Sequence, residues 1–377
     1  MEHVQKPLRI AMFGHKRIPS REGGIEIVVE ELTTRLVTLG NEVTCFNRKG
    51  HHVSGSQFDA AVSKEYKGVK LKQVLTVNRK GLAAMSSSFF AAFRCAFGKF
   101  DVVHIHAEGP AAMSWLPKLF GKKVVVTVHG LDWARAKWGG FATKYIKWGE
   151  KQAVKHADSI IVLSRNVQDY FKKEYGRDTV FIPNGVDRPE IREAQEIRKL
   201  WGLEKDSYVL FLGRLVPEKG LKYLVEAWKD IKTEKRLVIA GGSSDTEDFL
   251  NELKAMSPEN VVFTGFQQGR VLEELYSNAY IYCLPSDLEG MPLSLLEAMS
   301  YGNCCVVSDI PECAEVVENE AVTFLHGNVD DLKRTIQDLM DNELKVLEYK
   351  KTAAEFITRK YNWDDVVYRT MKLYSNE

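Results

Sequence analysis

Two glutamates stand eight residues apart in the segment LPSDLEGMPLSLLEAMSYGNCCVVSD, residues 284–309. Glu289 follows the apolar run AYIYCLP, whereas Glu297 lies in a helical pattern that begins near Pro292 and ends at Gly302. A helix N-terminus offers unpaired N–H groups and a positive dipole end, which suit a diphosphate. The two carboxylates are then placed to accept hydroxyl hydrogen bonds on either side of it. The alternative is a pair of solvated surface carboxylates.

Two cations, Arg214 and Lys219, lie in the segment LGRLVPEKG, directly after a predicted strand. Pro217 shapes the turn between them. Cations at the carboxyl end of a strand can bind diphosphate oxygens through charge-assisted hydrogen bonds. Exposed charges in an ordinary strand-to-helix loop are the alternative, and the neighbouring glutamate segment favours the diphosphate clamp.

A glycine pair, Gly23 and Gly24, lies between the first predicted strand and its helix. Small residues there allow backbone N–H groups to approach an anion, and Lys16, Arg17 and Arg21 add positive charge. A purely structural turn is the alternative. The fingerprint G-x-G-x-x-G is absent from this turn, which counts against a dehydrogenase.

Three histidines end predicted strands, His104 and His106 in VVHIHAEGP and His129 in VVVTVHGLDW. A metal site is one interpretation, but the spacing with no nearby carboxylate set gives it weak support. We favour a polar contact to a sugar for His129 and a mixed structural or acceptor role for the other two.

Short β-branched runs alternate with helical patterns along the chain, which is typical of βαβ units and parallel sheets. Strands are predicted at LRIAMFG, EVTCFN, VKLKQVL, DVVHIH, KKVVVTVH, SIIVLS and TVFIP, then at YVLFLGR, RLVIAG, NVVFTGF, AYIYCLP, NCCVVS and AVTFL. The segment FIPNGVDRPEI interrupts this periodicity. We therefore predict an α/β fold with two doubly wound, Rossmann-like domains, residues 1–187 and 188–361, facing a central cleft.

Composition is ordinary for a globular chain, with 45% hydrophobic and 27% charged residues. The net charge of +1 conceals an asymmetry, because residues 1–190 carry 30 Lys and Arg against 18 Asp and Glu. Such a basic half suggests an anionic partner. The six cysteines form no C-x-x-C pair and fit a reducing cytoplasm. No apolar signal core or membrane-spanning run is apparent, so a cytoplasmic location is expected.

Together these segments resemble the large family of retaining glycosyltransferases with the GT-B fold, which makes bacterial polysaccharides, glycolipids and sucrose-type products. The resemblance runs from REGGIE through TVHG, ADSIIVLS, IPNGVD, LGRLVPEKG and FTGF to EGMPLSLLEAMSYG and VVSDIPECAEVV. It implies a nucleotide-sugar donor and a saccharide or lipid-linked acceptor, with no nucleic-acid partner. It also implies that the last helix, residues 362–377, returns to the first domain.

The resemblance further implies a role for each matching residue. Glu297 would hold the ribose hydroxyls and Glu289 the hydroxyls of the transferred sugar, while Arg214 and Lys219 would neutralise the diphosphate. The remaining donor contacts would be made by His129 to the sugar, Gly24, Gly290, Met291 and Leu293 to the diphosphate, and Gly265 and Phe266 beside the base.

In such enzymes the leaving diphosphate is stabilised by preorganised cations and a helix terminus, so neither a cofactor nor a metal is expected. The sequence has no D-x-D triplet, which makes a metal-dependent GT-A transferase an unfavoured interpretation. Two rivals stay open: a sugar-nucleotide epimerase of similar fold, and a non-catalytic nucleotide-sugar-binding protein. A uridine diphosphate donor is favoured by base rate alone.

The stretch GLAAMSSSFFAAFRCAFGKF, residues 81–100, has two interpretations. It is either an interfacial helix that exposes Phe89, Phe90, Phe93 and Phe97 to an anionic membrane, or an ordinary crossover helix that buries them. The second interpretation is favoured, and peripheral membrane contact stays a hypothesis.

Overall fold

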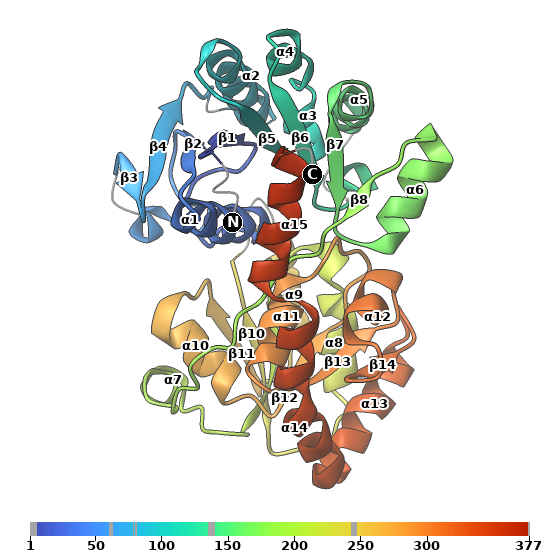
Figure 1. The fold of residues 1–377 in the computed structure, drawn as a ribbon. Helices are drawn as coiled ribbons and strands as arrows, with labels where there is room; N and C mark the ends of the chain where they lie inside the picture. The colour runs from blue at the N-terminus through green and yellow to red at the C-terminus, as the bar shows by residue number, and fades with distance from the viewer. Residues whose placement is uncertain are drawn as a thin grey trace, which may run out of the picture. The chain divides into compact units, whose positions relative to one another are not determined.

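The computed structural model describes residues 6–59, 63–77, 79, 81–134, 140–242 and 247–375. These residues fall into two compact units, each built around one sheet flanked by helices (Figure 1). Unit 1 comprises Met1–Asn184 together with Trp363–Glu377, and unit 2 comprises Gly185–Asn362. The boundaries predicted from the sequence lie after residue 187 and after residue 361.

Unit 1 contains an eight-stranded sheet in the order β3-β4-β2-β1-β5-β6-β7-β8. Its strands are β1 (Arg9–Phe13), β2 (Glu42–Arg48), β3 (Glu65–Tyr66), β4 (Val69–Val74), β5 (Val102–His106), β6 (Lys123–Val128), β7 (Ser159–Val162) and β8 (Val180–Phe181). The β3–β4 pair is antiparallel and the other neighbouring pairs are parallel. The strands that follow β1 in the chain, β2 to β4, all lie on one side of it in the sheet. The next strand, β5, pairs with the other side of β1, so strand order reverses between β1 and β5.

Helices cover both faces of this sheet. They are α1 (Gly24–Thr38), α2 (Leu82–Phe97), α3 (Glu108–Ala111), α4 (Trp115–Leu119), α5 (Gly140–His156), α6 (Arg165–Tyr175) and α15 (Trp363–Ser375), with short 3-10 turns at Ser56–Phe58 and Asp132–Ala134. Alternation along β5 separates the two faces. Val103 and Ile105 join a core with Ala91 and Cys95 of α2, whereas His104 contacts Tyr374 of α15.

Unit 2 contains a six-stranded parallel sheet in the order β11-β10-β9-β12-β13-β14. Its strands are β9 (Tyr208–Leu212), β10 (Arg236–Ala240), β11 (Val261–Gly265), β12 (Ile281–Leu284), β13 (Cys304–Ser308) and β14 (Val322–Phe324). Strand order reverses between β9 and β12. Ligands in open parallel sheets bind beyond the carboxyl ends of strands at such a reversal.

The helices of unit 2 are α7 (Glu196–Trp201), α8 (Leu221–Trp228), α9 (Glu247–Met256), α10 (Gly269–Ser277), α11 (Leu293–Ser300), α12 (Pro311–Val317), α13 (Val329–Asp341) and α14 (Glu343–Lys360), with a 3-10 turn, η3, at Pro217–Lys219. Local chemistry sets several of these boundaries. Asn328 caps the start of α13 with its side chain, Asn342 does the same for α14, and Ser164 begins α6 in unit 1 in this way.

The cores are apolar and close-packed around both sheets. Strands such as β6 and β13 are buried on both faces, as parallel strands between helix layers must be. All six cysteines are buried and free. Among the residues described, no helix is both long and apolar enough to cross a bilayer.

Candidate active site

The loop after β9 brings Lys219 to the carboxyl edge of the second sheet. Pro217 starts η3, Lys219 ends it, and Gly220 follows with a positive φ of 66°. A Cβ at Gly220 would lie 1.8 Å from the carbonyl oxygen of Pro285, so no larger residue fits. This close approach holds the loop after β9 directly against the loop after β12, which carries Glu289.

Lys219 and Glu289 form an ion pair that is largely buried. The Nζ atom of Lys219 lies 2.5 Å from Oε1 of Glu289, and the two side chains are 13% and 8% exposed. The same carboxylate oxygen accepts a hydrogen bond of 2.6 Å from the hydroxyl of the buried Ser286. Ser308 in turn donates to the carbonyl oxygen of Ser286 at 2.6 Å. The carboxylate of Glu289 is therefore held in one position, with a cation at its side.

Glu297 lies one turn into α11, on the helix that follows the Glu289 loop. The hydroxyl of Tyr276, on α10, donates to its Oε2 atom at 3.0 Å. Tyr276 also stacks on Tyr301, with ring centroids 5.2 Å apart. These contacts fix the position of the Glu297 side chain, which stays partly exposed.

The N-terminus of α11 lies between the two glutamates in the chain. Pro292 is its N-cap residue, its carbonyl accepts from Leu295 and Leu296, and Leu293 is the first helical residue. In a helix, the N–H groups that precede the first intrahelical hydrogen bond have no partner within the helix. Gly290 and Met291 are buried immediately before the helix begins. The helix begins where the sequence predicted, and binding of an anion by its N-terminus stays a prediction.

The remaining predicted residues of unit 2 lie at the same edge of the sheet. Arg214 follows β9 by two residues and is half-buried. Gly265 ends β11 with a φ of 71°, and its carbonyl accepts from the N–H of Gly241 after β10, at 2.9 Å. Phe266 follows Gly265. Arg214 therefore lies beside the reversal of strand order between β9 and β12, whereas Gly265 and Phe266 lie at the carboxyl end of the edge strand β11.

The three histidines of unit 1 come together at the ends of β5 and β6. Nδ1 of His106 lies 3.0 Å from Nε2 of His129, and the rings of His104 and His106 stack at 4.3 Å. Both ring nitrogens of His104 are used, by Tyr374 at 2.6 Å and Thr127 at 2.7 Å. Burial lowers the pKa of His104 to about 3 and that of His106 well below its ordinary value, so both rings are neutral near pH 7.

His106 also marks the reversal of strand order in the first sheet. It ends β5, and a Cβ at Gly14, just after β1, would lie 2.0 Å from its carbonyl oxygen. Gly14 has a φ of 112°, which a larger residue rarely adopts. His106 and His129 therefore lie at the carboxyl edge of the first sheet, where open α/β sheets generally bind ligands.

The carboxylate of Glu26 lies beside the glycine turn that precedes α1. Gly24 is the first residue of α1, and Glu26 lies in its first turn, almost fully buried. Oε1 of Glu26 accepts from the backbone N–H of Lys16 at 2.8 Å, and its Oε2 would lie 2.9 Å from a Cβ at Gly23. Arg17 is engaged by the carbonyls of Gly50 and His51. The positive charge expected at this turn is thus partly offset by groups of the protein itself.

Two partners of the predicted site were missed from the sequence. Ser286 lies three residues before Glu289, a spacing that could have drawn attention to it, whereas Tyr276 lies on another helix and gave no signal.

A pocket of about 460 Å³ opens beside Asp287, lined by Tyr223, Phe249 and Glu252 among others, and it contains none of the predicted residues. Within the described part of the chain, no group of three His, Cys, Asp or Glu residues is arranged to hold a metal ion.

The chain matches two family models, one over each half. Residues 193–363 match "Glycosyl transferases group 1" and residues 22–189 match "Glycosyltransferase Family 4". An uncharacterised glycosyltransferase of Methanocaldococcus jannaschii is 26% identical over 97% of this chain and 98% of its own length. The Escherichia coli UDP-Gal:alpha-D-GlcNAc-diphosphoundecaprenol alpha-1,3-galactosyltransferase is 31% identical over 60% of this chain and 62% of its own.

The fold has close structural counterparts. HepE of Anabaena, in complex with UDP and glucose, superposes with a TM-score of 0.82 at 15% identity, covering 98% of this chain and 100% of that one. Its likeness supports a fold made of two α/β domains. With both halves matched by glycosyltransferase models, the chain belongs to the group 1 glycosyltransferases and is an enzyme of the GT-B fold.

Proposed function

We propose that the enzyme transfers a sugar from a UDP-sugar to a saccharide or lipid-linked saccharide in cell-surface polysaccharide synthesis. Transfer would retain the anomeric configuration and need no metal ion. The observation that carries this proposal is the Lys219–Glu289 ion pair, 2.5 Å long, at the strand reversal of unit 2 and just before the N-terminus of α11.

The chemistry that these residues can perform follows from charge. When the bond between the anomeric carbon and the phosphate oxygen breaks, negative charge develops on the diphosphate and positive character on the sugar. Lys219, Arg214 and the first N–H groups of α11 offer fixed positive charge to the leaving group. Such preorganised charge stabilises a transition state without the solvent having to reorganise.

The glutamates would recognise the two hydroxyl-bearing parts of the donor. Glu289 accepts from Lys219 and Ser286 and has further acceptor positions for sugar hydroxyls. Glu297 would accept from the ribose hydroxyls. Gly290, Met291 and Leu293 would offer backbone contacts to the diphosphate, and Gly265 and Phe266 would lie beside the base.

Two residues of unit 1 complete the proposed set. The family resemblance assigns His129 to the donor sugar and Gly24 to the diphosphate. The hydrogen-bond distance between His129 and His106 supports a fixed orientation for the His129 ring. The carboxylate of Glu26 beside Gly23 weakens the case for a strong anion contact at Gly24.

The choice of UDP and of the acceptor rests on relatives. HepE binds UDP and glucose in its structure, and the E. coli relative is named for a UDP-galactose donor and a diphosphoundecaprenol-linked acceptor. Retention is proposed from the family resemblance. In that mechanism the leaving diphosphate takes the proton of the attacking acceptor hydroxyl, on the same face of the sugar that the diphosphate leaves.

The experiment is a panel of UDP-sugars incubated with lipid-diphosphate-linked saccharides in the presence of EDTA, with release of UDP measured. We expect turnover that requires both substrates, and a product whose anomeric coupling by NMR matches that of the donor. Transfer with inverted configuration would contradict retention, and transfer that stops in EDTA would contradict metal independence. Conversion of a UDP-sugar into its epimer without any acceptor would favour the epimerase instead.

A further inference from the structure

An exposed aromatic stripe runs along α2 of unit 1. Phe89, Phe93 and Phe97 follow one another at intervals of four residues, so they share one helix face. Their exposed fractions are 43%, 49% and 60%. The opposite face, with Ala91 and Cys95, is buried in the core. The helix is therefore the predicted crossover helix, yet of the four phenylalanines only Phe90 packs against that core.

The stripe continues onto α4. The rings of Phe97 and Phe120 lie 4.4 Å apart, and Leu119 beside Phe120 is 73% exposed. Nζ of Lys122 donates to the carbonyl oxygen of Gly98 at 2.7 Å, which ties the ends of the two helices together. We call Phe89, Phe93, Phe97, Leu119 and Phe120 the aromatic face.

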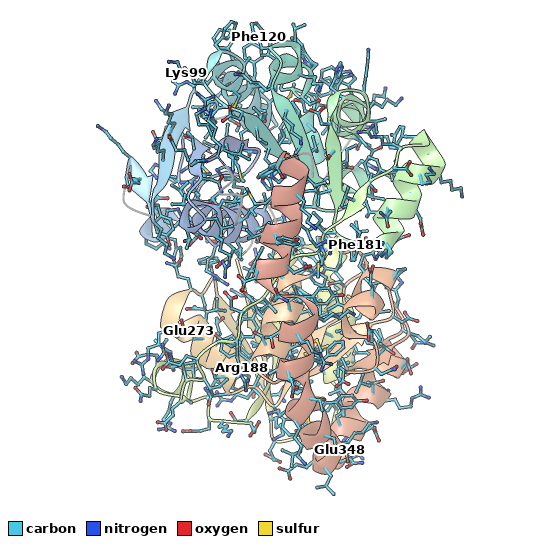
Figure 2. All side chains as sticks on the ribbon, viewed as in Figure 1. Lys99, Phe120, Phe181, Arg188, Glu273 and Glu348 are labelled. Atoms are coloured by element: carbon cyan, nitrogen blue, oxygen red, sulfur yellow. The ribbon has the colours of Figure 1, made fainter. Side chains whose placement is uncertain are left out.

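The segments that carry the aromatic face are basic in composition. Segments 81–100 and 112–123 contain no Asp or Glu, and their basic residues are Arg94, Lys99, Lys118, Lys122 and Lys123. Lys99 and Phe120 are labelled at the same end of unit 1 in Figure 2. Lys118 pairs with Asp158 at 2.5 Å, and Lys123 donates to the carbonyl oxygen of Tyr374 at 3.2 Å. Arg94 and Lys99 are exposed, on and just after α2, and we call these two residues the basic border.

We propose that the aromatic face and its basic border dock onto an anionic lipid surface. Rings enter the boundary between headgroups and acyl chains, while Arg94 and Lys99 remain at the level of the lipid phosphates. A second copy of this chain is a poorer partner, because a symmetric contact would bring the same basic border face to face with itself. This proposal goes beyond the proposed function and does not depend on it.

The test is sedimentation with vesicles of phosphatidylcholine alone and of phosphatidylcholine with phosphatidylglycerol, at low and high salt. We expect the wild-type protein to pellet only with the anionic vesicles, and less at high salt, because the lipid charge is screened. The double variant Phe93→Ser/Phe97→Ser and the double variant Arg94→Glu/Lys99→Glu should stay in the supernatant. Each basic residue lost should weaken binding by about fivefold or more.

Controls use one exposed apolar residue and one exposed basic residue elsewhere on the surface. Leu344→Ser removes a side chain that is 74% exposed on α14, and Lys205→Glu reverses an exposed charge in unit 2. Both should bind vesicles as the wild type does, and unchanged unfolding midpoints would show that all variants are folded.

Three results would overturn the proposal. The wild type fails to pellet with anionic vesicles, or the phenylalanine variant pellets as well as the wild type does. In the third, sedimentation velocity shows self-association that the phenylalanine variant abolishes, while no vesicle is bound. None of these measurements uses a nucleotide or a sugar. A result that refutes membrane docking therefore leaves the proposed enzymatic activity untouched, and the reverse also holds.

Discussion

Replacing Glu289 by Gln should leave UDP binding intact or improve it. The ammonium of Lys219 lies 2.5 Å from the Glu289 carboxylate. A diphosphate must compete with that carboxylate for the same ammonium. Gln keeps an oxygen that can accept from Ser286 but removes the negative charge, so Lys219 becomes more available to the diphosphate.

The magnitude follows from the environment of the pair. The side chains are only 13% and 8% exposed, so solvent screens them weakly. Hydrogen bonds to charged groups contribute about 1.5–3 kcal/mol. If the lower value is recovered on binding, UDP affinity rises by about tenfold. The gain should be confined to UDP, because a UDP-sugar also loses the contact between its sugar and Glu289, and transfer should fall by about a hundredfold.

Calorimetric titration of UDP and a UDP-sugar measures both effects. The matched control is Glu252→Gln, which breaks the ion pair of Glu252 with Lys222, also 2.5 Å long but 55% and 47% exposed. This control should bind both ligands as the wild type does. A clear fall in UDP affinity in Glu289→Gln would refute the competition, and unchanged turnover would refute the role given to Glu289.

Three further predictions use other residues of the two units. Glu297→Gln should lower the affinities for UDP and for the UDP-sugar equally, by about tenfold, because only a ribose contact is lost; a loss confined to the UDP-sugar in calorimetry would contradict this. Lys219→Met should lower the free energy of unfolding of unit 2 by about 3 kcal/mol, because it leaves the Glu289 carboxylate without its partner. Adding Glu289→Gln removes that carboxylate charge and should restore part of the loss. Simply additive losses in urea unfolding would argue against a coupled pair. Burial lowers the pKa of His15 to about 4 and that of His104 to about 3. The unfolded chain therefore binds more protons between about pH 6.5 and pH 4, so the free energy of unfolding falls as pH falls, by about 1.4 kcal/mol per pH unit for each histidine. His15→Gln should remove one such contribution, and an unchanged slope would show the assignment to be wrong.

The parallel strands were predictable because their apolar, β-branched runs are buried on both faces. All thirteen predicted strands are present, including β6 at KKVVVTVH and β12 at AYIYCLP. The exception is β3, a two-residue antiparallel strand at Glu65–Tyr66 that is too short to show a pattern of its own. Its pairing depends on the neighbouring β4 and not on its own composition.

The candidate site was predictable as a set of residues but not as a set of contacts. Parallel strand order brings Lys219 and Glu289 to one edge, yet their direct ion pair depends on the close approach of Gly220 to Pro285. Tyr276 reaches Glu297 from another helix, which no local spacing reveals. Proximity in the fold, and not in the sequence, determines both contacts.

Helix α2 shows a further limit of prediction from the sequence. Its periodicity allowed either a buried crossover helix or an interfacial helix, and the structure contains features of both. Small residues such as Ala91 and Cys95 pack in the core, while Phe93 and Phe97 remain about half exposed. The sequence pattern identified the helix but did not tell which side chains face the core, because small residues can pack more closely against a sheet than large ones can.

The most direct test of the central claim is a calorimetric comparison of UDP with UMP, carried out with the wild-type protein in EDTA. If Lys219, Arg214 and the N-terminus of α11 form a clamp for the diphosphate, UDP should bind at least about tenfold more tightly than UMP, without any metal ion. Equal affinities for UDP and UMP, or binding of UDP that disappears in EDTA, would contradict it.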